Sequence, residues 1–221
     1  MTPPASSPGG LEGVVAGASA KSRVFGQDGR LFYCGYPVEA LAEEGTFEEC
    51  IYLLWNGELP NEEQLAAFNE ELSARAEVSK PIWDVLRPLV EGQSIMGLLR
   101  TGVSAMSAFD PDVEATRDAA SGRAELERSI ALRVQARVAT IVAGAARLKQ
   151  GDEPIAPRSD LSFAGNFLFM LNGEEPSPEE ERIFDAALTL HADHGFNAST
   201  FSARVTAATE ADMYAAVTSA I

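Results

Sequence analysis

The sequence predicts an all-α protein that carries one small β-hairpin near its N-terminus. Apolar residues recur at helical spacing from Pro37 onward, and capping boxes and glycine stops divide this pattern into separate helices. The only convincing strand signal is Val24-Phe25 and Leu31-Phe32-Tyr33 on either side of Gly26-Gln27-Asp28-Gly29. The 221 residues, 46% hydrophobic and 23% charged, can bury the core of one large domain or of part of one.

The first ten residues differ from the rest of the chain. The segment 1–10 is rich in proline and small residues, which predicts a flexible tail. It lacks the basic flank and apolar stretch of a signal peptide, and no apolar run approaches the length of a membrane span. We therefore expect a cytoplasmic protein whose folded part covers residues 11–221.

Helix starts and stops follow in chain order. Capping boxes predict helix starts at Thr46-Phe47-Glu48-Glu49, Asn61-Glu62-Glu63-Gln64 and Ser177-Pro178-Glu179-Glu180, and Thr209-Glu210-Ala211-Asp212 opens a last helix. Helical spacing predicts further helices over residues 81–90, 94–108, 124–149 and 161–171. Asp110-Pro111 should end the second of these, and Gly57, Gly151 and Gly173 should end others.

The longest predicted helix, residues 124–149, has an alanine-rich centre. Its small residues would let another helix approach closely. We expect a tight helix–helix contact there, either inside the fold or across a dimer, with the 94–108 helix as its partner. The small residues are Ala136, Ala139, Ala143, Gly144, Ala145 and Ala146.

Charge and cysteine usage exclude several classes of function. Thirty-three acidic residues against 17 basic ones give a formal charge of −16, which argues against nucleic acid or an anionic membrane as partner. An anionic small substrate would need a local basic pocket.

Cys34 and Cys50 have no metal-site spacing and are expected to be buried, reduced thiols. The main basic concentration should form a solvated face of ion pairs on the long helix; it comprises Arg123, Arg128, Arg133, Arg137, Arg147 and Lys149.

Polar, chemically capable side chains converge between Leu190 and Phe201. The helix that starts at Pro178 should run toward His194 and end at Gly195, and Asn197 should cap a second helix. The last carbonyls of the first helix would favour a cationic His194, while the first N–H groups of the second helix would attract an anion. A carboxylate ligand suits both helix ends.

Two other interpretations of this stretch stay open. His191 and His194 can be ordinary half-buried residues at a helix end, with Asn197 only a cap. Alternatively, His191, Asp193 and His194 can be metal ligands. Asp193 and His194 are sequence neighbours, however, and would point about 100° apart on a helix, which suits coordination poorly.

Several blocks of residues 11–221 resemble the N-terminal half or more of the citrate synthase family. The most specific block is His191-Ala192-Asp193-His194-x-x-Asn197-Ala198-Ser199-Thr200. Weaker blocks precede it in the family's order, at Gly35–Val38, Phe47–Glu49, Leu53–Pro60, Leu99–Ser104 and Asn166–Leu171.

The resemblance implies the large helical domain of an all-α, homodimeric acyltransferase that condenses acetyl-CoA with oxaloacetate in the tricarboxylic acid cycle. Neither a metal nor a bound cofactor is implied. By motif match, His194 and Asn197 are expected to bind oxaloacetate, with His191 in a supporting role. In the family, the base Asp, two further histidines and the substrate-binding arginines lie in blocks that would follow Ile221, together with the small domain. We therefore expect a fragment without catalytic residues of its own, and the apolar, uncapped last helix fits that expectation.

The sequence departs from the family pattern at two places. Cys34 stands where the family usually has Arg, and Ser94-Ile95 stands where it usually has His-Pro. A 2-methylcitrate synthase, which uses propionyl-CoA, is a second enzymatic interpretation. A helical interaction module without activity is a third.

Overall fold

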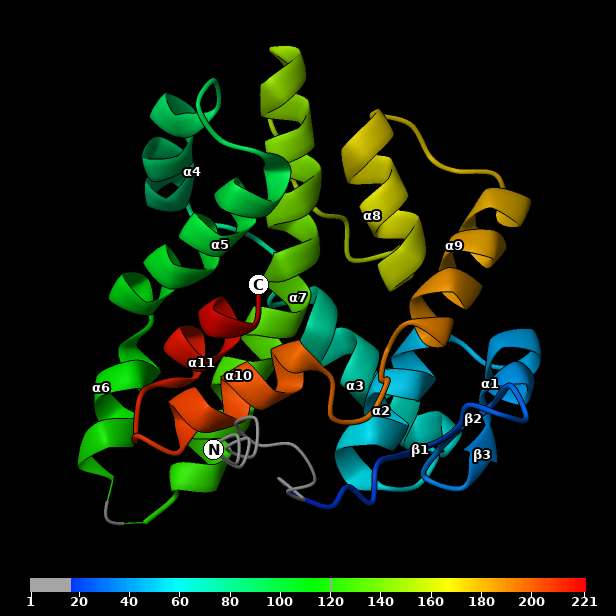
Figure 1. Ribbon diagram of the computed structural model, residues 1–221. Helices are drawn as coiled ribbons and strands as arrows, with labels where there is room; N and C mark the ends of the chain where they lie inside the picture. Colours follow the sequence, from blue (N-terminus) through cyan, green and yellow to red (C-terminus); the bar gives the residue numbers. More distant parts are fainter. Residues whose placement is uncertain (1–16, 120) are drawn as a thin grey trace, which may run out of the picture.

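The computed structural model describes residues 17–119 and 121–221, which form eleven α-helices and one small sheet (Figure 1). The predicted all-α class with an N-terminal hairpin is confirmed. The predicted tail, residues 1–10, lies outside the described residues.

The sheet contains the predicted hairpin and one further strand. Strands β1 (Ser22–Phe25) and β2 (Arg30–Tyr33) are antiparallel, with Ser22 opposite Tyr33. A short third strand, β3 (Tyr36–Pro37), pairs with β2 and was not predicted. The turn between them consists of Cys34 and Gly35, whose φ angles are 48° and 95°. Positive φ angles at both residues are typical of a tight two-residue hairpin turn. A positive φ angle is uncommon for a residue other than glycine, and no sequence pattern predicted a turn at Cys34.

Three predicted capping boxes form. Thr46, Asn61 and Ser177 each accept from the backbone N–H three residues on, and Glu49, Gln64 and Glu180 reach back. The first seven helices after the sheet are α1 (Val38–Glu44), α2 (Phe47–Asn56), α3 (Glu62–Ser73), α4 (Lys80–Leu86), α5 (Ile95–Met106), α6 (Pro111–Asp118) and α7 (Arg123–Gln150). The remaining helices are α8 (Phe163–Asn172), α9 (Pro178–Leu190), α10 (Ala198–Ala207) and α11 (Met213–Ala220).

Two helix predictions differ from the structure. Asp110-Pro111 ends the preceding helical segment, but it also starts α6, because the Asp110 side chain accepts from the Asp112 N–H and Pro111 occupies the first turn. Helix α9 ends at Leu190, four residues before His194.

Helix α7 is the centre of the fold, with α4 and α5 on one side and α8 on the other (Figure 1). Its Ile130, Val134 and Ile141 belong to a core with α4, α5 and α11, whereas Leu132 and Ala136 belong to a second core with β2, α1, α2 and α3. Length and composition alone would let α7 cross a membrane, contrary to the sequence expectation. Within the fold, however, 56% of its apolar window is buried, as expected of a core helix.

Two of the small residues of α7, Ala143 and Gly144, pack against other parts of this chain. Ala143 is fully buried, and a Cβ atom added to Gly144 would lie 2.3 Å from Trp83. On the facing helix α5, a Cβ atom at Gly102 would lie 3.1 Å from Ile141. The predicted tight contact between the long helix and the 94–108 helix is therefore confirmed within one subunit.

A buried polar group joins α6, α7 and α11. Arg133 donates two hydrogen bonds of 2.7 Å to the carboxylate of Asp110, and Tyr214 donates a third of 2.6 Å. Asp110 is 5% exposed and Tyr214 is fully buried. Because three charge-assisted hydrogen bonds satisfy the carboxylate, its burial is compatible with a stable fold.

Packing against α7 leads to a first prediction. Ala143→Leu should lower the free energy of unfolding by about 1–3 kcal/mol, because the larger side chain has no space in a filled core. Ala139→Leu is the matched control, since Ala139 is only partly buried and lines a groove. Urea denaturation of both variants measures the difference. Equal losses would contradict the assigned packing.

Candidate functional site

The candidate site is the loop of residues 191–197, between α9 and α10. The sequence prediction that α9 continues to His194 is wrong. His191 and Ala192 close the helix end with bonds to carbonyls three residues back, Leu188 and Thr189. Gly195, with φ 70°, turns the loop instead of ending the helix. His194 therefore does not lie at a helix C-terminus, and that electrostatic argument for its charge fails.

The start of α10 agrees with the prediction. The Asn197 Oδ1 atom accepts from the Thr200 N–H at 2.8 Å and caps the helix. This use of Oδ1 leaves the amide NH₂ group of Asn197, which is exposed, to donate to a ligand. The N-terminus of the ten-residue α10 adds a positive partial charge beside it.

The two histidines have different environments. The His191 Nδ1 atom is 2.7 Å from the Ala187 carbonyl oxygen, so its ring is held against α9. His194 is exposed and forms no hydrogen bond with the described residues. The structure thus leaves His194 accessible and gives His191 a local structural contact.

The loop is held through Asp193. The Tyr33 hydroxyl accepts from the Asp193 N–H at 3.2 Å and lies 3.0 Å from the Asp193 carbonyl, to which it donates. The Asp193 carboxylate accepts from the Ser22 hydroxyl and, at 2.6 Å, from the Gly195 N–H. Sequence reasoning missed Ser22 and Tyr33, which are 171 and 160 residues away from Asp193 and carry no local signal.

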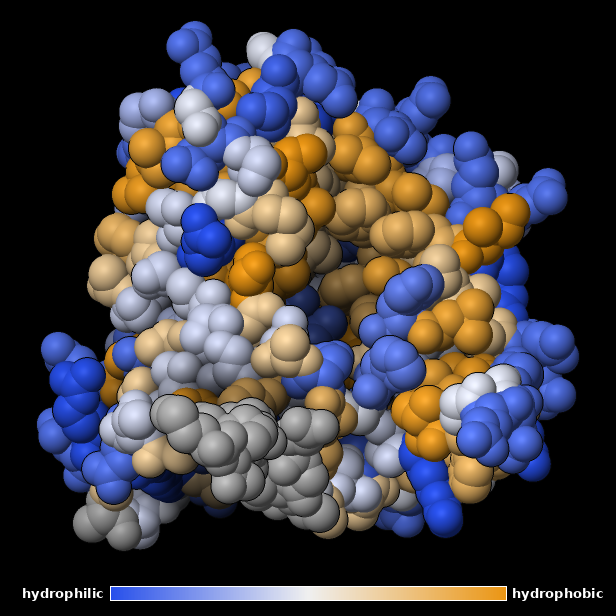
Figure 2. Space-filling model, viewed as in Figure 1, coloured by the Kyte–Doolittle hydropathy of each residue, from blue (hydrophilic) through white to orange (hydrophobic). Residues whose placement is uncertain are grey.

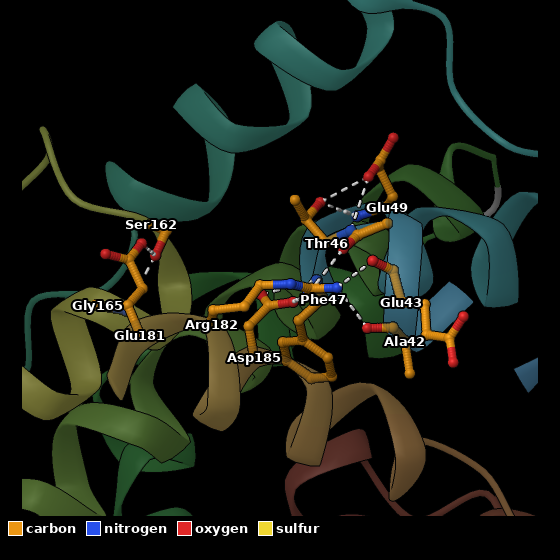
Figure 3. A network of polar contacts seen from close by, with 11 residues as sticks. Ala42, Glu43, Thr46, Phe47, Glu49, Ser162, Gly165, Glu181, Arg182 and Asp185 are labelled. Atoms are coloured by element: carbon orange, nitrogen blue, oxygen red, sulfur yellow. Dashed lines mark hydrogen bonds and ion pairs between the residues drawn. The ribbon is translucent and has the colours of Figure 1, made fainter. Parts of the chain in front are cut away.

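Helix α9, which leads into the loop, is anchored at its other end by the polar network of Figure 3. Arg182 donates to the Ala42 carbonyl at 2.6 Å and to the Glu43 carbonyl at 2.5 Å, both at the end of α1. Asp185, 6% exposed, accepts from the Phe47 N–H at 3.0 Å, at the start of α2. One turn of α9 thereby provides hydrogen-bond partners for backbone groups at the end of α1 and at the start of α2, which have no partner within their own helices.

A second buried carboxylate lies beside this network. Glu48 is 5% exposed and accepts from the Phe163 N–H at 2.7 Å, which joins α2 to α8. Burial raises the pKa of Glu48 above its ordinary value, and the nearby carboxylates of Asp185 and Glu181 raise it further. Burial also raises the pKa of Asp185.

Two basic side chains lie near the histidine loop, on a cavity that Asp193 also lines. A cavity of about 330 Å³ beside Asp193 and Gly195 is lined by Lys21 and Arg204, and the Arg204 guanidinium lies 4.6 Å from the centre of the Phe196 ring. His194 and Asn197 do not line this cavity. The basic residues of α7, in contrast, mostly bind groups of this chain: Arg123 pairs with Glu127, Arg133 with Asp110 and Asp112, and Arg147 with Asp152. The prediction of a solvated face is wrong for Arg133, whose side chain is only 15% exposed because it binds the buried Asp110.

Two other surface features bear on the site. Figure 2 shows a hollow at the centre of the viewed face with apolar side chains around it. Large apolar side chains are also exposed along α9, the loop and α10, at Ile183, Leu190, Phe196, Phe201 and Val205. A larger groove of about 790 Å³ between α3, α7 and α8 is acidic, with Glu48, Glu70 and Asp160 in its lining, and therefore does not suit an anionic ligand.

Within residues 17–119 and 121–221, no group of three His, Cys, Asp or Glu side chains could hold a metal ion. The ring of His191 contacts Ala187, and the carboxylate of Asp193 is used by Ser22 and Gly195. The alternative interpretation of His191, Asp193 and His194 as metal ligands therefore has no support in the geometry.

The fold defines an all-α protein whose candidate site is the loop between α9 and α10. A family model described as "Citrate synthase, C-terminal domain" matches residues 10–221. The chain therefore belongs to the citrate synthase family, as the sequence resemblance indicated.

Known proteins agree with this assignment. Citrate synthase of Haloferax volcanii is 48% identical over 213 residues, covering 96% of this chain and 55% of the relative. A 2-methylcitrate synthase of Mycobacterium tuberculosis H37Rv is 43% identical over 212 residues, covering 96% and 52%. The crystal structure of citrate synthase from Pyrobaculum aerophilum has a TM-score of 0.91 and 36% identity, covering 95% and 53%. The chain thus spans about half the length of the relatives it matches, and its assignment to one part of the large domain stays a prediction.

The buried Glu48 leads to a second prediction. Folding raises the pKa of this carboxyl group, so the folded state binds the proton more tightly than the unfolded state does. The free energy of unfolding therefore falls as the pH rises from about 4 through the pKa of the group in the folded state. Glu48→Gln keeps an oxygen that can accept from Phe163 and removes the charge. Its melting temperature should exceed that of the wild type at pH 7–8, and the difference should vanish near pH 4. Glu44→Gln, at an exposed position, is the control. An equal shift of the melting temperature in both variants would contradict the argument. A higher melting temperature for Glu48→Gln at low pH only would contradict it too.

Proposed function

We propose that this chain provides the oxaloacetate-binding loop of an enzyme that condenses acetyl-CoA with oxaloacetate. In this reaction the methyl carbon of the acetyl group loses a proton and bonds to the keto carbon of oxaloacetate, and water then cleaves the thioester to give citrate and CoA. The observation that carries the proposal is the accessible pair of His194 and Asn197 in a loop beside the N-terminus of α10. The family relationship supports the same substrate.

Each proposed contact uses a group that the fold leaves available. The exposed His194 ring can donate an N–H to a carboxylate or keto oxygen of oxaloacetate, and the Asn197 NH₂ group can donate a second hydrogen bond. Lys21 and Arg204 add positive charge close to the loop, which offsets locally the repulsion expected from a formal charge of −16. His191 supports the loop and does not contact the substrate.

Acetyl-CoA is a cosubstrate in this proposal, with no bound cofactor and no metal. We further propose that the protein works as a cytoplasmic homodimer, without nucleic acid or membrane as partner; the resemblance and the acidic composition support this. A condensation with propionyl-CoA is the second candidate, because 2-methylcitrate synthases are also among the relatives at 43% identity. A helical interaction module without activity is less well supported, since the histidine loop is intact.

The assignment of His194 leads to a third prediction. His194→Ala should weaken oxaloacetate binding by roughly 10²-fold, because a hydrogen bond to a charged group is lost. His191→Ala should weaken it much less. Isothermal titration of oxaloacetate into each variant measures the effect, and wild-type affinity in His194→Ala would refute the assignment.

Asn197→Asp provides a more selective test of the same site. The aspartate keeps the cap of α10, since its oxygen still accepts from the Thr200 N–H, but it replaces the NH₂ donor by a negative charge. Oxaloacetate binding should therefore decrease by at least tenfold with no loss of helix content by circular dichroism. A parallel loss of helix content would mean that the variant tests the cap and not the ligand contact.

A fourth prediction concerns turnover. The 221 residues by themselves should form no citrate from acetyl-CoA and oxaloacetate, because the carboxylate nearest the histidines, Asp193, is engaged by Ser22 and Gly195 and is not available as a base. Release of CoA thiol, followed with a thiol reagent, is the assay. Turnover that Asp193→Asn abolishes would show that this carboxylate is the base after all.

A further inference from the structure

One cross-strand pair of the hairpin binds the residue that precedes His194. Ser22 on β1 and Tyr33 on β2 are direct register partners, so both side chains lie on the same face of the sheet. The Ser22 hydroxyl donates to the carboxylate of Asp193, while the Tyr33 hydroxyl binds its backbone N–H and carbonyl at 3.2 and 3.0 Å. Side chain and main chain of Asp193 are thus held from one rigid element.

Tyr33 is well suited to this task because it is buried and neutral. The residue is fully buried in a core with Val38, Leu41 and Leu53. Burial raises the pKa of Tyr33, so its hydroxyl keeps its proton and continues to donate well above neutral pH. Its hydroxyl also lies 3.4 Å from the carbonyl oxygen of Leu190, which is the last residue of α9. The hydroxyl thus lies beside the last residue of α9 as well as against the loop.

His194 has no comparable contact of its own. Its side chain is exposed and forms no hydrogen bond with the part of the chain that the structure describes. Its position is set by its two neighbours, Asp193 and Gly195, and the Gly195 N–H is itself bound to the Asp193 carboxylate at 2.6 Å. Whatever holds Asp193 therefore sets the position of the His194 backbone, from which the imidazole projects.

We propose that Tyr33, assisted by Ser22, is a positioning residue that fixes the backbone of the histidine loop, and with it the point from which the His194 imidazole projects, for binding of a dicarboxylate substrate. Its role in substrate binding rests on the function proposed above for His194, whereas its role in ordering the loop does not. The hairpin is then part of the site, although none of its residues is proposed to touch the substrate. Pre-ordering of the loop reduces the entropy that binding would otherwise lose.

The chain offers a matched pair of variants for the test. Tyr33→Phe and Tyr214→Phe each remove one hydroxyl from a fully buried ring that makes hydrogen bonds, but Tyr214 binds Asp110 and has no contact with the loop. Both should lose stability, so stability alone cannot distinguish them. The chain contains only two histidines, His191 and His194, so His191→Gln assigns the imidazole ¹³C–¹H signals unambiguously.

Two readouts follow the loop without requiring activity. In Tyr33→Phe, amide exchange at Asp193 and Gly195 should accelerate about tenfold, the factor expected for loss of one net hydrogen bond. The His194 imidazole signal should shift and broaden, and the Kd for oxaloacetate should rise about tenfold. Ser22→Ala should give smaller changes of the same kind, and Tyr214→Phe should give none.

The outcomes separate this proposal from the proposed function. Wild-type exchange and a wild-type His194 signal in Tyr33→Phe would overturn the positioning role, and so would equal changes in Tyr214→Phe. If oxaloacetate leaves the His194 signal of the wild type unchanged, the proposed function fails, while a change of that signal in Tyr33→Phe still supports the ordering of the loop. Should Tyr33→Phe not fold, Ser22→Ala, which alters a partly exposed side chain, decides by the same readouts.

Discussion

Helix α7 must bury two opposite faces at once, and the rest of the fold depends on this constraint. Ile130 and Ile141 face one core while Leu132 and Ala136 face another, so helices have to cover both sides. Small residues such as Ala143 and Gly144 let the covering elements approach closely. The layers on the two sides then carry the hairpin, α9 and α10, whose junction is the candidate site (Figure 1).

The site is built by polar contacts between segments far apart in the chain. Arg182 and Asp185 anchor α9 to the ends of α1 and α2 (Figure 3), and Tyr33 binds the loop that follows α9. Asp185 and Tyr33 are buried and hydrogen-bonded, so α9 and the loop are both fastened to the rest of the fold. An ordered loop that keeps an exposed imidazole and an exposed amide is consistent with recognition of a small carboxylate.

The acidic composition and the proposed anionic substrate are compatible because charge is distributed unevenly. The cations of α7 mostly bind groups within the chain, and the groove between α3, α7 and α8 has acidic side chains in its lining. Lys21 and Arg204 lie instead beside the histidine loop. The field at the loop therefore differs from the field expected from net charge alone.

Local patterns in the sequence determined most of the helices, because capping boxes at Thr46, Asn61 and Ser177 and glycines at helix ends act through neighbouring residues. The block from His191 to Thr200 likewise indicated the family and the candidate ligand residues. Only the tertiary structure showed that α9 ends at Leu190, where the N–H groups of His191 and Ala192 bond to carbonyls three residues back. The loop that follows is bound by Tyr33, which lies 160 residues before Asp193. The tertiary structure also showed that Ala143 and Gly144 of α7 pack inside one subunit and that Asp193 is held by the hairpin, because contacts between distant segments leave no periodic signal in the sequence.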